Sequence, residues 1–173
     1  MHPNTLTTMS NLAIVLDSLG KYADAEAMNR QTLEIREEVL GKMHPNTLTT
    51  MSNLALVLSS QGKYADAEAM NCQTLEICEE VLGKMHPDTL TTMSNLAIVL
   101  YKQGKYADAE TMNCQTLEIQ EEVLGKMHPD TLTTMSNLAI VLYKQGKYAD
   151  AETMNCQTDR KSTRLNSSHQ YYL

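Results

Sequence analysis

The feature of this sequence that most constrains its fold is an internal repeat. The residues His-Pro-Asn-Thr-Leu at 2–6 return three times, with Asn or Asp at the third place, at 44–48, 86–90 and 128–132. The period is therefore 42 residues. A period of about 20 to 50 residues is typical of proteins that stack copies of one small unit, because a single unit cannot bury its apolar face alone. The period predicts a stacked repeat protein.

Each repeat contains two helical patterns, which the first repeat illustrates. Its first apolar stripe has the spacing of one face of an α-helix and consists of Met9, Leu12, Ala13 and Leu16. This stripe predicts a helix over about residues 4–19, and a second stripe that begins at Ala25 predicts a helix over about residues 22–40. Only two or three residues around Gly20 separate the two helices, and so short a link makes antiparallel neighbours.

The period divides the chain into five segments. They are repeat 1 (2–43), repeat 2 (44–85), repeat 3 (86–127), a truncated repeat 4 (128–158) and a non-repeat tail (159–173). The tail resembles the translation of a common sequencing-library adapter, so we expect it to be artefactual and disordered. Neither end of the chain carries a polar capping helix. We therefore expect the chain to be a fragment of a longer array, with uncapped ends through which copies can self-associate.

The repeat resembles the tetratricopeptide repeat. Leu12-Ala13, Gly20, Tyr22 and Ala25 have the spacing of that family's signature. The 42-residue period, with His-Pro-Asn or His-Pro-Asp opening each unit, resembles the longer repeats of kinesin light chains and of fungal and bacterial signalling proteins with NACHT or NB-ARC domains. The resemblance covers residues 2–158. It implies an all-α fold, a right-handed superhelical solenoid of antiparallel helix pairs, in which the first helices line a concave groove.

Two positions depart from the family pattern. Asn stands at 29, 71, 113 and 155, where the family usually has a large aromatic or apolar residue, and Thr stands at 32, 74, 116 and 158, where it usually has Ala. A buried Asn is costly unless it is hydrogen-bonded. Either these amides pair between repeats, or the stack is looser than a consensus array.

A second, more polar stripe on the first helix of each repeat would face the groove if the resemblance holds. An Asn amide offers both a donor and an acceptor, so a column of Asn can hold the backbone of an extended peptide. The Tyr and Lys residues of the last two repeats would add aromatic contact and positive charge, which favour an acidic or aromatic residue in the peptide. The candidate binding residues are Asn11, Asn53, Asn95, Asn137, Ile98, Ile140, Tyr101, Lys102, Tyr143 and Lys144. The alternative is that they are solvated positions copied by duplication.

Two functions fit a peptide-binding array. The first is a protein- or peptide-binding scaffold similar to the cargo-binding array of kinesin light chains. The second is a ligand-sensing, autoinhibitory arm of a larger signalling NTPase. The near-identity of the repeats favours this second function, because recently duplicated arrays suit recognition surfaces that change quickly. The two differ in what precedes the array in the gene, a heptad coiled coil for the first and a nucleotide-binding domain for the second.

Composition and spacing argue against other functions. Residues 159–173 hold one acidic and three basic residues, which leaves 20 acidic and 11 basic residues, a charge of −9, on the rest of the chain. So acidic a body is a poor match for nucleic acid or anionic lipid. No stretch is long and apolar enough to cross a membrane, and no signal peptide opens the chain, so we expect a cytoplasmic protein. No nucleophile–base or carboxylate pair recurs at catalytic spacing, so we expect neither enzymatic activity nor a cofactor.

The His and Cys columns do not have the spacing of metal ligands. One His precedes Pro at the start of each repeat, where it can cap the helix or pack against it, and a metal site would need ligands closer together than one per repeat. Cys72, Cys114 and Cys156 are one period apart. Packed helices lie about 8–10 Å apart, more than the roughly 7 Å that a disulfide can span between Cα atoms. We expect reduced thiols and no metal site.

Overall fold

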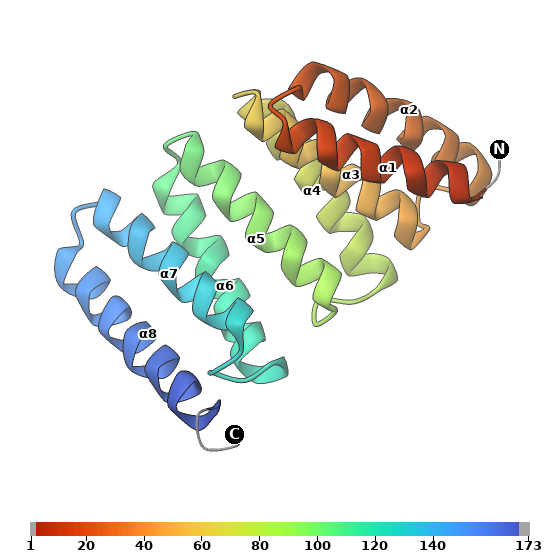
Figure 1. Cartoon of the computed structure of the whole chain (residues 1–173). Coiled ribbons are helices and arrows are strands. Elements are labelled where there is room, and N and C mark those ends of the chain that lie inside the picture. The colour runs from red at the N-terminus through yellow and green to blue at the C-terminus, as the bar shows by residue number, and fades with distance from the viewer. Residues whose placement is uncertain (1–2, 170–173) are drawn as a thin grey trace. The chain divides into compact units, whose positions relative to one another are not determined.

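A computed structural model describes residues 3–169 of the chain and the side chains of residues 5–159. Over this range every regular element is an α-helix (Figure 1). The helices are α1 (Pro3–Ser18), α2 (Tyr22–Leu40), α3 (Pro45–Ser60), α4 (Tyr64–Val81), α5 (Pro87–Lys102), α6 (Tyr106–Val123), α7 (Pro129–Lys144) and α8 (Tyr148–His169). Each repeat contributes one helix pair, so the predicted all-α fold of helix pairs is confirmed.

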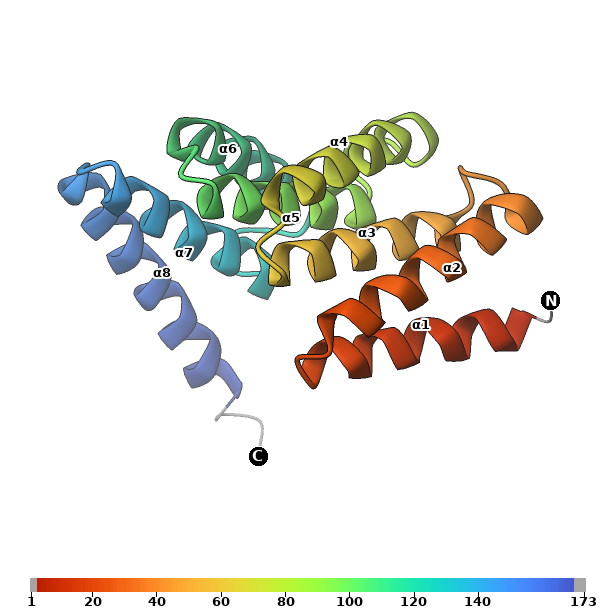
Figure 2. The ribbon, with the colours of Figure 1, turned by 90° about the horizontal axis from the view of Figure 1, so that it is seen from above.

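The chain forms two compact units, Met1–Lys84 with α1 to α4 and Met85–Leu173 with α5 to α8. Inside each unit every helix packs on the next one along the chain. The two helices of a repeat run antiparallel, as Figures 1 and 2 show for α1 with α2 and for α7 with α8. The first helices of neighbouring repeats also touch, α1 with α3 and α5 with α7. Each unit therefore has a face lined by two first helices.

Histidine caps the first helix in repeats 2, 3 and 4. The backbone at His44, His86 and His128 is extended, and a Pro follows at the first position of the helix. Each imidazole Nδ1 accepts a hydrogen bond, at 3.1–3.2 Å, from the backbone N–H two residues later. This bond satisfies one of the N–H groups that a helix start leaves without a partner. The predicted capping role is confirmed at these three residues, while His2 lies outside the described range.

The turn between the two helices of a repeat requires glycine. At Gly62 the backbone φ is 78°, in the left-handed region that residues with a Cβ rarely adopt. The next N–H, of Lys63, donates to the carbonyl of Leu58 at 2.9 Å, and the Gly62 N–H donates to Ser59 at 3.1 Å. These two bonds close the end of α3 and reverse the chain into α4.

The Thr residues that depart from the family pattern are satisfied inside their own helices. Thr32, Thr74 and Thr116 are fully buried. Their hydroxyls donate to the carbonyls of Met28, Met70 and Met112, one turn earlier, at 2.8 Å in each case. Thr can therefore replace Ala here without leaving a buried polar atom unpaired.

The Asn residues that depart from the family pattern behave differently. Asn29, Asn71 and Asn113 are buried, and the Oδ1 of each lacks a hydrogen-bond partner. The sequence left open whether these amides pair between repeats or the stack is looser than a consensus array. The Oδ1 atoms do not pair between repeats. Asn155, at the same position of α8, is exposed.

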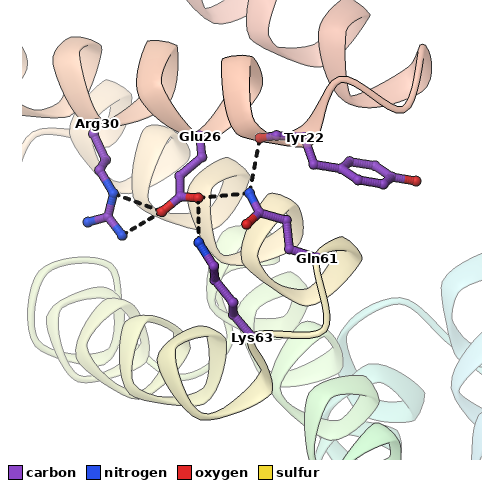
Figure 3. A network of polar contacts seen from close by, with 5 residues as sticks. All are labelled: Tyr22, Glu26, Arg30, Gln61 and Lys63. Carbon is purple, nitrogen blue, oxygen red and sulfur yellow. Dashed lines mark hydrogen bonds and ion pairs between the residues drawn. The ribbon is translucent and has the colours of Figure 1, made fainter.

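The helix pairs of unit Met1–Lys84 are joined by a polar network that centres on Glu26 of α2 (Figure 3). The carboxylate accepts hydrogen bonds from Lys63 Nζ at 2.8 Å, from Arg30 at 2.8 and 3.1 Å, and from Gln61 Nε2 at 2.8 Å. Gln61 Nε2 also donates to the carbonyl of Tyr22 at 3.0 Å. Since Gln61 and Lys63 lie in the turn after α3, the network fixes α3 against α2.

Unit Met85–Leu173 repeats this joint with fewer partners. Lys147 Nζ donates to both carboxylate oxygens of Glu110, at 2.7 and 2.8 Å, and Gln145 donates to the carbonyl of Tyr106 at 2.9 Å. Cys114 stands in this unit at the position of Arg30. Glu110 therefore has no counterpart of the hydrogen bonds that Arg30 donates to Glu26. The bonds from Lys147 nonetheless lower the pKa of Glu110.

We expect Glu26→Gln to lower the free energy of unfolding by about 1 kcal/mol at pH 7, and by much less near pH 2. Hydrogen bonds from Lys63, Arg30 and Gln61 lower the pKa of Glu26 to about 2. A lowered pKa stabilises the fold above the ordinary value of 4.5, and this stabilisation is lost as the pH falls toward 2. The gain stays small because Arg30 and Lys63 are about half exposed to water.

Urea denaturation at pH 7 and at pH 2 measures this difference. Glu34→Gln is the matched control, because it removes a carboxylate from an exposed position of the same helix. An equal loss for both variants at pH 7 would contradict the role of the network.

The tail continues α8. The sequence predicts disorder from residue 159, whereas in the structure the helix runs to His169. Residues 159–169 contain neither Pro nor Gly, so a helix that is already formed can propagate through them. Residues 170–173 lie outside the described range, and the artefactual origin of the tail stays a prediction. None of the described helices is both long and apolar enough to cross a membrane.

Candidate functional site

The face between α5 and α7 carries a pocket of about 230 Å³ in unit Met85–Leu173. Six of the predicted binding residues lie on this face. They are Asn95, Asn137, Ile98, Ile140, Tyr101 and Lys102. The lining residues are Ala97, Ile98, Tyr101, Lys102, Asn113, Asn137, Ile140 and Val141. The walls are mostly aliphatic, the amide of Asn137 and the charge of Lys102 are the polar groups from the first helices, and Asn113 comes from α6 beneath them.

A larger cleft of about 490 Å³ lies on the same face and shares Ile98 and Asn137 with the pocket. Asn95 lines it together with Ser94 and Thr91 of α5. The two cavities therefore share part of their lining and follow one another along α5. Five of the predicted residues from α5 and α7 meet at the pocket, and Asn95 joins them at the cleft.

Unit Met1–Lys84 has a smaller pocket, of about 90 Å³, at the same place in the repeat. Every residue that lines it stands 84 positions, two periods, before a residue that lines the pocket of the other unit. They are Ala13, Ile14, Asp17, Asn29, Asn53, Leu56 and Val57. Asp17 takes the place of Tyr101, so the two pockets carry opposite charge, Asp17 in the first and Lys102 in the second. The site is thus a feature of the repeat, and its polarity changes along the chain.

Each of the two pockets is also lined by a buried Asn from the second helix of a repeat. Asn113 is 2% exposed and its Oδ1 has no partner, and Asn29 is fully buried with neither amide atom paired. A buried amide that lacks hydrogen bonds costs about 1–3 kcal/mol, unless another molecule supplies the missing group. Sequence reasoning did not place these residues in the groove, although their departure from the family pattern marked the positions.

The remaining predicted residues do not reach these pockets. Tyr143 is 60% exposed, and its ring packs edge-on against Tyr148 with 5.1 Å between the ring centres. Lys144 is also exposed at the end of α7, and Asn11 is exposed on α1. Tyr101 packs against Tyr106 with tilted rings whose centres are 5.7 Å apart, but it also lines the pocket.

The pockets offer groups that can contact a ligand. Their lining offers aliphatic contact area, amide donors and acceptors, and one charged group each. Within the described residues no three His, Cys, Asp or Glu side chains lie close enough to hold a metal ion together. On α6, burial and the neighbouring Glu110 raise the pKa of the Cys114 thiol, which opposes formation of a reactive thiolate.

Comparison with known proteins agrees with this architecture. The tetratricopeptide repeat family matches the chain over residues 4–80, 73–122 and 88–158. A search of the curated proteins gave no match. Among solved structures, the chain is similar to BtubC (BKLC) from P. vanneervenii, with a TM-score of 0.85 and 24% identity over 93% of this chain and 64% of that chain.

Two further structures share the fold. A putative kinesin light chain from P. anserina with nearly identical TPR-like repeats has a TM-score of 0.50 and 19% identity, over 96% of this chain and 99% of that chain. A Rap protein complexed with Competence and Sporulation Factor has a TM-score of 0.80 and 16% identity, over 95% of this chain and 44% of that chain. The chain thus spans less than two thirds of the length of BtubC and less than half of the Rap protein.

The family match and the structure lead to the same assignment. The match extends over most of the 173 residues, and each 42-residue repeat folds as an antiparallel helix pair closed by a glycine turn. The chain belongs to the tetratricopeptide repeat family.

Proposed function

We propose that this chain is a scaffold that binds an extended peptide on the face lined by the first helices of each unit. The observation that carries the proposal is the pocket between α5 and α7, where aliphatic walls, two amides and a cation meet. A pocket of this kind is typical of ligand sites, which combine apolar contact area with a few polar groups. The Rap protein of similar fold, which was solved in complex with Competence and Sporulation Factor, supports a binding role for such an array.

Each lining group has a distinct role in this proposal. Asn95 and Asn137 donate to and accept from the peptide backbone, whatever its side chains are. Ile98 and Ile140 contact an apolar or aromatic side chain that enters the pocket. Lys102 lies on the same wall and favours a carboxylate next to that side chain. Asn113 offers its unpartnered Oδ1 to a donor on the part of the ligand that reaches deepest.

The two units select different residues of the peptide. Asp17 occupies the position of Tyr101 in the pocket of unit Met1–Lys84, and one oxygen of its carboxylate is buried without a partner. That pocket therefore favours a basic or hydrogen-bond-donating side chain, whereas the pocket with Lys102 favours an acidic one. Ligands of the two pockets are therefore expected to differ in charge.

Binding to an array of synthetic peptides tests the charge preference. We expect Lys102→Glu combined with Lys144→Glu to weaken binding of peptides with Asp or Glu by about tenfold or more, and to strengthen binding of peptides with Lys or Arg. Fluorescence anisotropy with the best peptide gives the dissociation constants. Lys84→Glu combined with Lys126→Glu is the control, because it makes the same charge change at two exposed residues that line none of the pockets described above.

A second pair of variants tests the backbone role. Asn95→Ala combined with Asn137→Ala is expected to weaken all bound peptides by a similar factor, since these amides read no side chain. Unchanged affinity in both double variants, with a peptide that does bind, would show that the ligand lies elsewhere. If no peptide of the array binds, the proposal is wrong.

A sensing arm of a signalling NTPase would use the same pockets. It differs from an independent scaffold in the domain joined to the array, and not in how the peptide is held. The uninterrupted reading frame around this sequence distinguishes the two, through a coiled coil or a nucleotide-binding domain upstream.

A further inference from the structure

The cleft of about 490 Å³, which α5, α6 and α7 line, contains a buried amide that the proposed function does not use. Gln120 of α6 lines this cleft and is 3% exposed, and its Oε1 lacks a hydrogen-bond partner. A buried carbonyl oxygen without a partner costs free energy unless a donor reaches it. The cleft therefore holds an acceptor that a ligand can satisfy.

The same position in the other unit holds an arginine. Arg36 of α2 stands two periods before Gln120 and is 5% exposed. Its Nη1 donates to the hydroxyl of Thr50 and to the backbone carbonyl of Asn46, both at the start of α3. A guanidinium thus fits between the second helix of one repeat and the first turns of the next.

Two sequence differences change this place in unit Met85–Leu173. Gln120 has a shorter side chain than the arginine it replaces, and Asp130 stands where Asn46 stands, so that an exposed carboxylate joins the lining. Thr134 corresponds to Thr50 and also lines the cleft. The cleft therefore keeps the groups that hold Arg36, gains a negative charge, and has no arginine of its own at this position.

The hydroxyl groups of the cleft are available as acceptors. Those of Thr91, Ser94 and Thr133 donate their protons to backbone carbonyls one turn earlier in their own helices, at 2.9–3.0 Å. Toward a ligand their oxygens can therefore only accept. The Nδ1 of His128 accepts the N–H of Asp130 at 3.2 Å, so this nitrogen carries no proton and the ring is uncharged. Among the described residues that line the cleft there is neither Lys nor Arg.

We propose that this cleft binds an arginine side chain of the peptide ligand, whose guanidinium takes the place that Arg36 fills in the other unit. It donates there to Gln120 Oε1, to the hydroxyl oxygen of Thr134 and to the carboxylate of Asp130. The planar guanidinium has several donors, which suits separate acceptors better than the compact ammonium of lysine. The inference rests on the proposed function, since Ile98 and Asn137 line both the cleft and the pocket and one peptide can reach both.

Paired peptide arrays test this proposal. Every peptide of the first array carries one arginine, and its counterpart in the second array carries citrulline there, which has a similar shape and no charge. We expect the wild-type chain to bind the best arginine peptide about tenfold or more tightly than its citrulline counterpart. Fluorescence anisotropy gives both dissociation constants.

A double variant fills the cleft in the way that the other unit does. Gln120→Arg combined with Asp130→Asn introduces the residues that stand at 36 and 46, and the fold accommodates both of them there. We expect this variant to bind the two peptides equally. Gln115→Arg combined with Asp108→Asn is the matched control and should keep the preference. It makes the same changes at exposed positions of α6 that line neither cavity.

Asp130→Asn alone gives a second measurement, because it changes an exposed residue and leaves Gln120 in place. It should reduce the preference for arginine by about threefold or more. Binding that does not distinguish arginine from citrulline, or a preference that Asp130→Asn and the double variant both leave unchanged, would overturn the inference and leave the scaffold function standing. Failure of every peptide to bind would reject both.

Discussion

Leu54→Ala is expected to lower the free energy of unfolding by about 2–5 kcal/mol, whereas Leu12→Ala at the same place in the preceding repeat should cost about 1 kcal/mol or less. Leu54 is among the most completely buried residues of the protein, and its removal leaves a cavity that the neighbouring helices cannot fill. Leu12 has lost much less contact with water, so truncation removes little burial. The two substitutions are chemically identical, and only the packing around them differs.

Urea denaturation at a concentration where the chain is monomeric measures both losses. Because the chain forms two compact units, the change should appear in the transition of the unit that contains α3. Similar losses for the two variants would contradict the difference in burial between Leu12 and Leu54.

Asn113→Leu is expected to raise the free energy of unfolding by about 1–3 kcal/mol, against the usual direction of a core substitution. The variant removes a buried amide whose oxygen is unpaired, and the pocket beside it gives the larger side chain room. Asn155→Leu makes the same change at an exposed position of α8 and should alter stability by less than about 0.5 kcal/mol. Thermal and urea unfolding of both variants measure the difference.

The Asn113→Leu variant should also bind peptide more weakly. Its leucine side chain would fill part of the pocket and remove the acceptor that the proposed ligand meets. Higher stability together with weaker binding would identify the amide as a group that is kept for recognition at a cost in stability. Lower stability would show that the amide is paired in solution, through a bound water or a neighbour, and that its role is structural.

The fold was predictable because every local signal agrees with the repeat. The helix predicted over about residues 22–40 is α2, Tyr22–Leu40, and the first helix, predicted over about residues 4–19, is α1, Pro3–Ser18. The predicted and observed ends of α1 differ by one residue, since the helix begins at Pro3 and ends at Ser18. Gly20 and its copies set the turn, and Ala25 and its copies are buried where the helices approach closely.

The site was predictable only as a face. The helical spacing of a second, more polar stripe on the first helices, together with the family resemblance, indicated Asn95, Asn137, Ile98 and Ile140. It could not indicate Asn113, because that residue belongs to the buried side of another helix and enters the pocket only through the way in which α6 lies under α5 and α7. Nor could it show that Tyr101 and Tyr143, which both pack against a tyrosine of the following helix, would differ in that only Tyr101 lines a pocket. Such contacts depend on packing between repeats, which periodicity does not encode.

The joint around Glu26 has a consequence for how arrays of this kind change length. The carboxylate belongs to the second helix of one repeat, while the Gln and Lys that bind it belong to the turn of the next. The Glu is present in all four repeats, and the Gln and Lys are both present in repeats 2 to 4. A gene that gains or loses one of these later units, by misaligned recombination between its identical stretches, still encodes a Gln and a Lys to follow each Glu. Such a lineage can vary the number of its recognition pockets in single genetic steps, without first evolving a new interface.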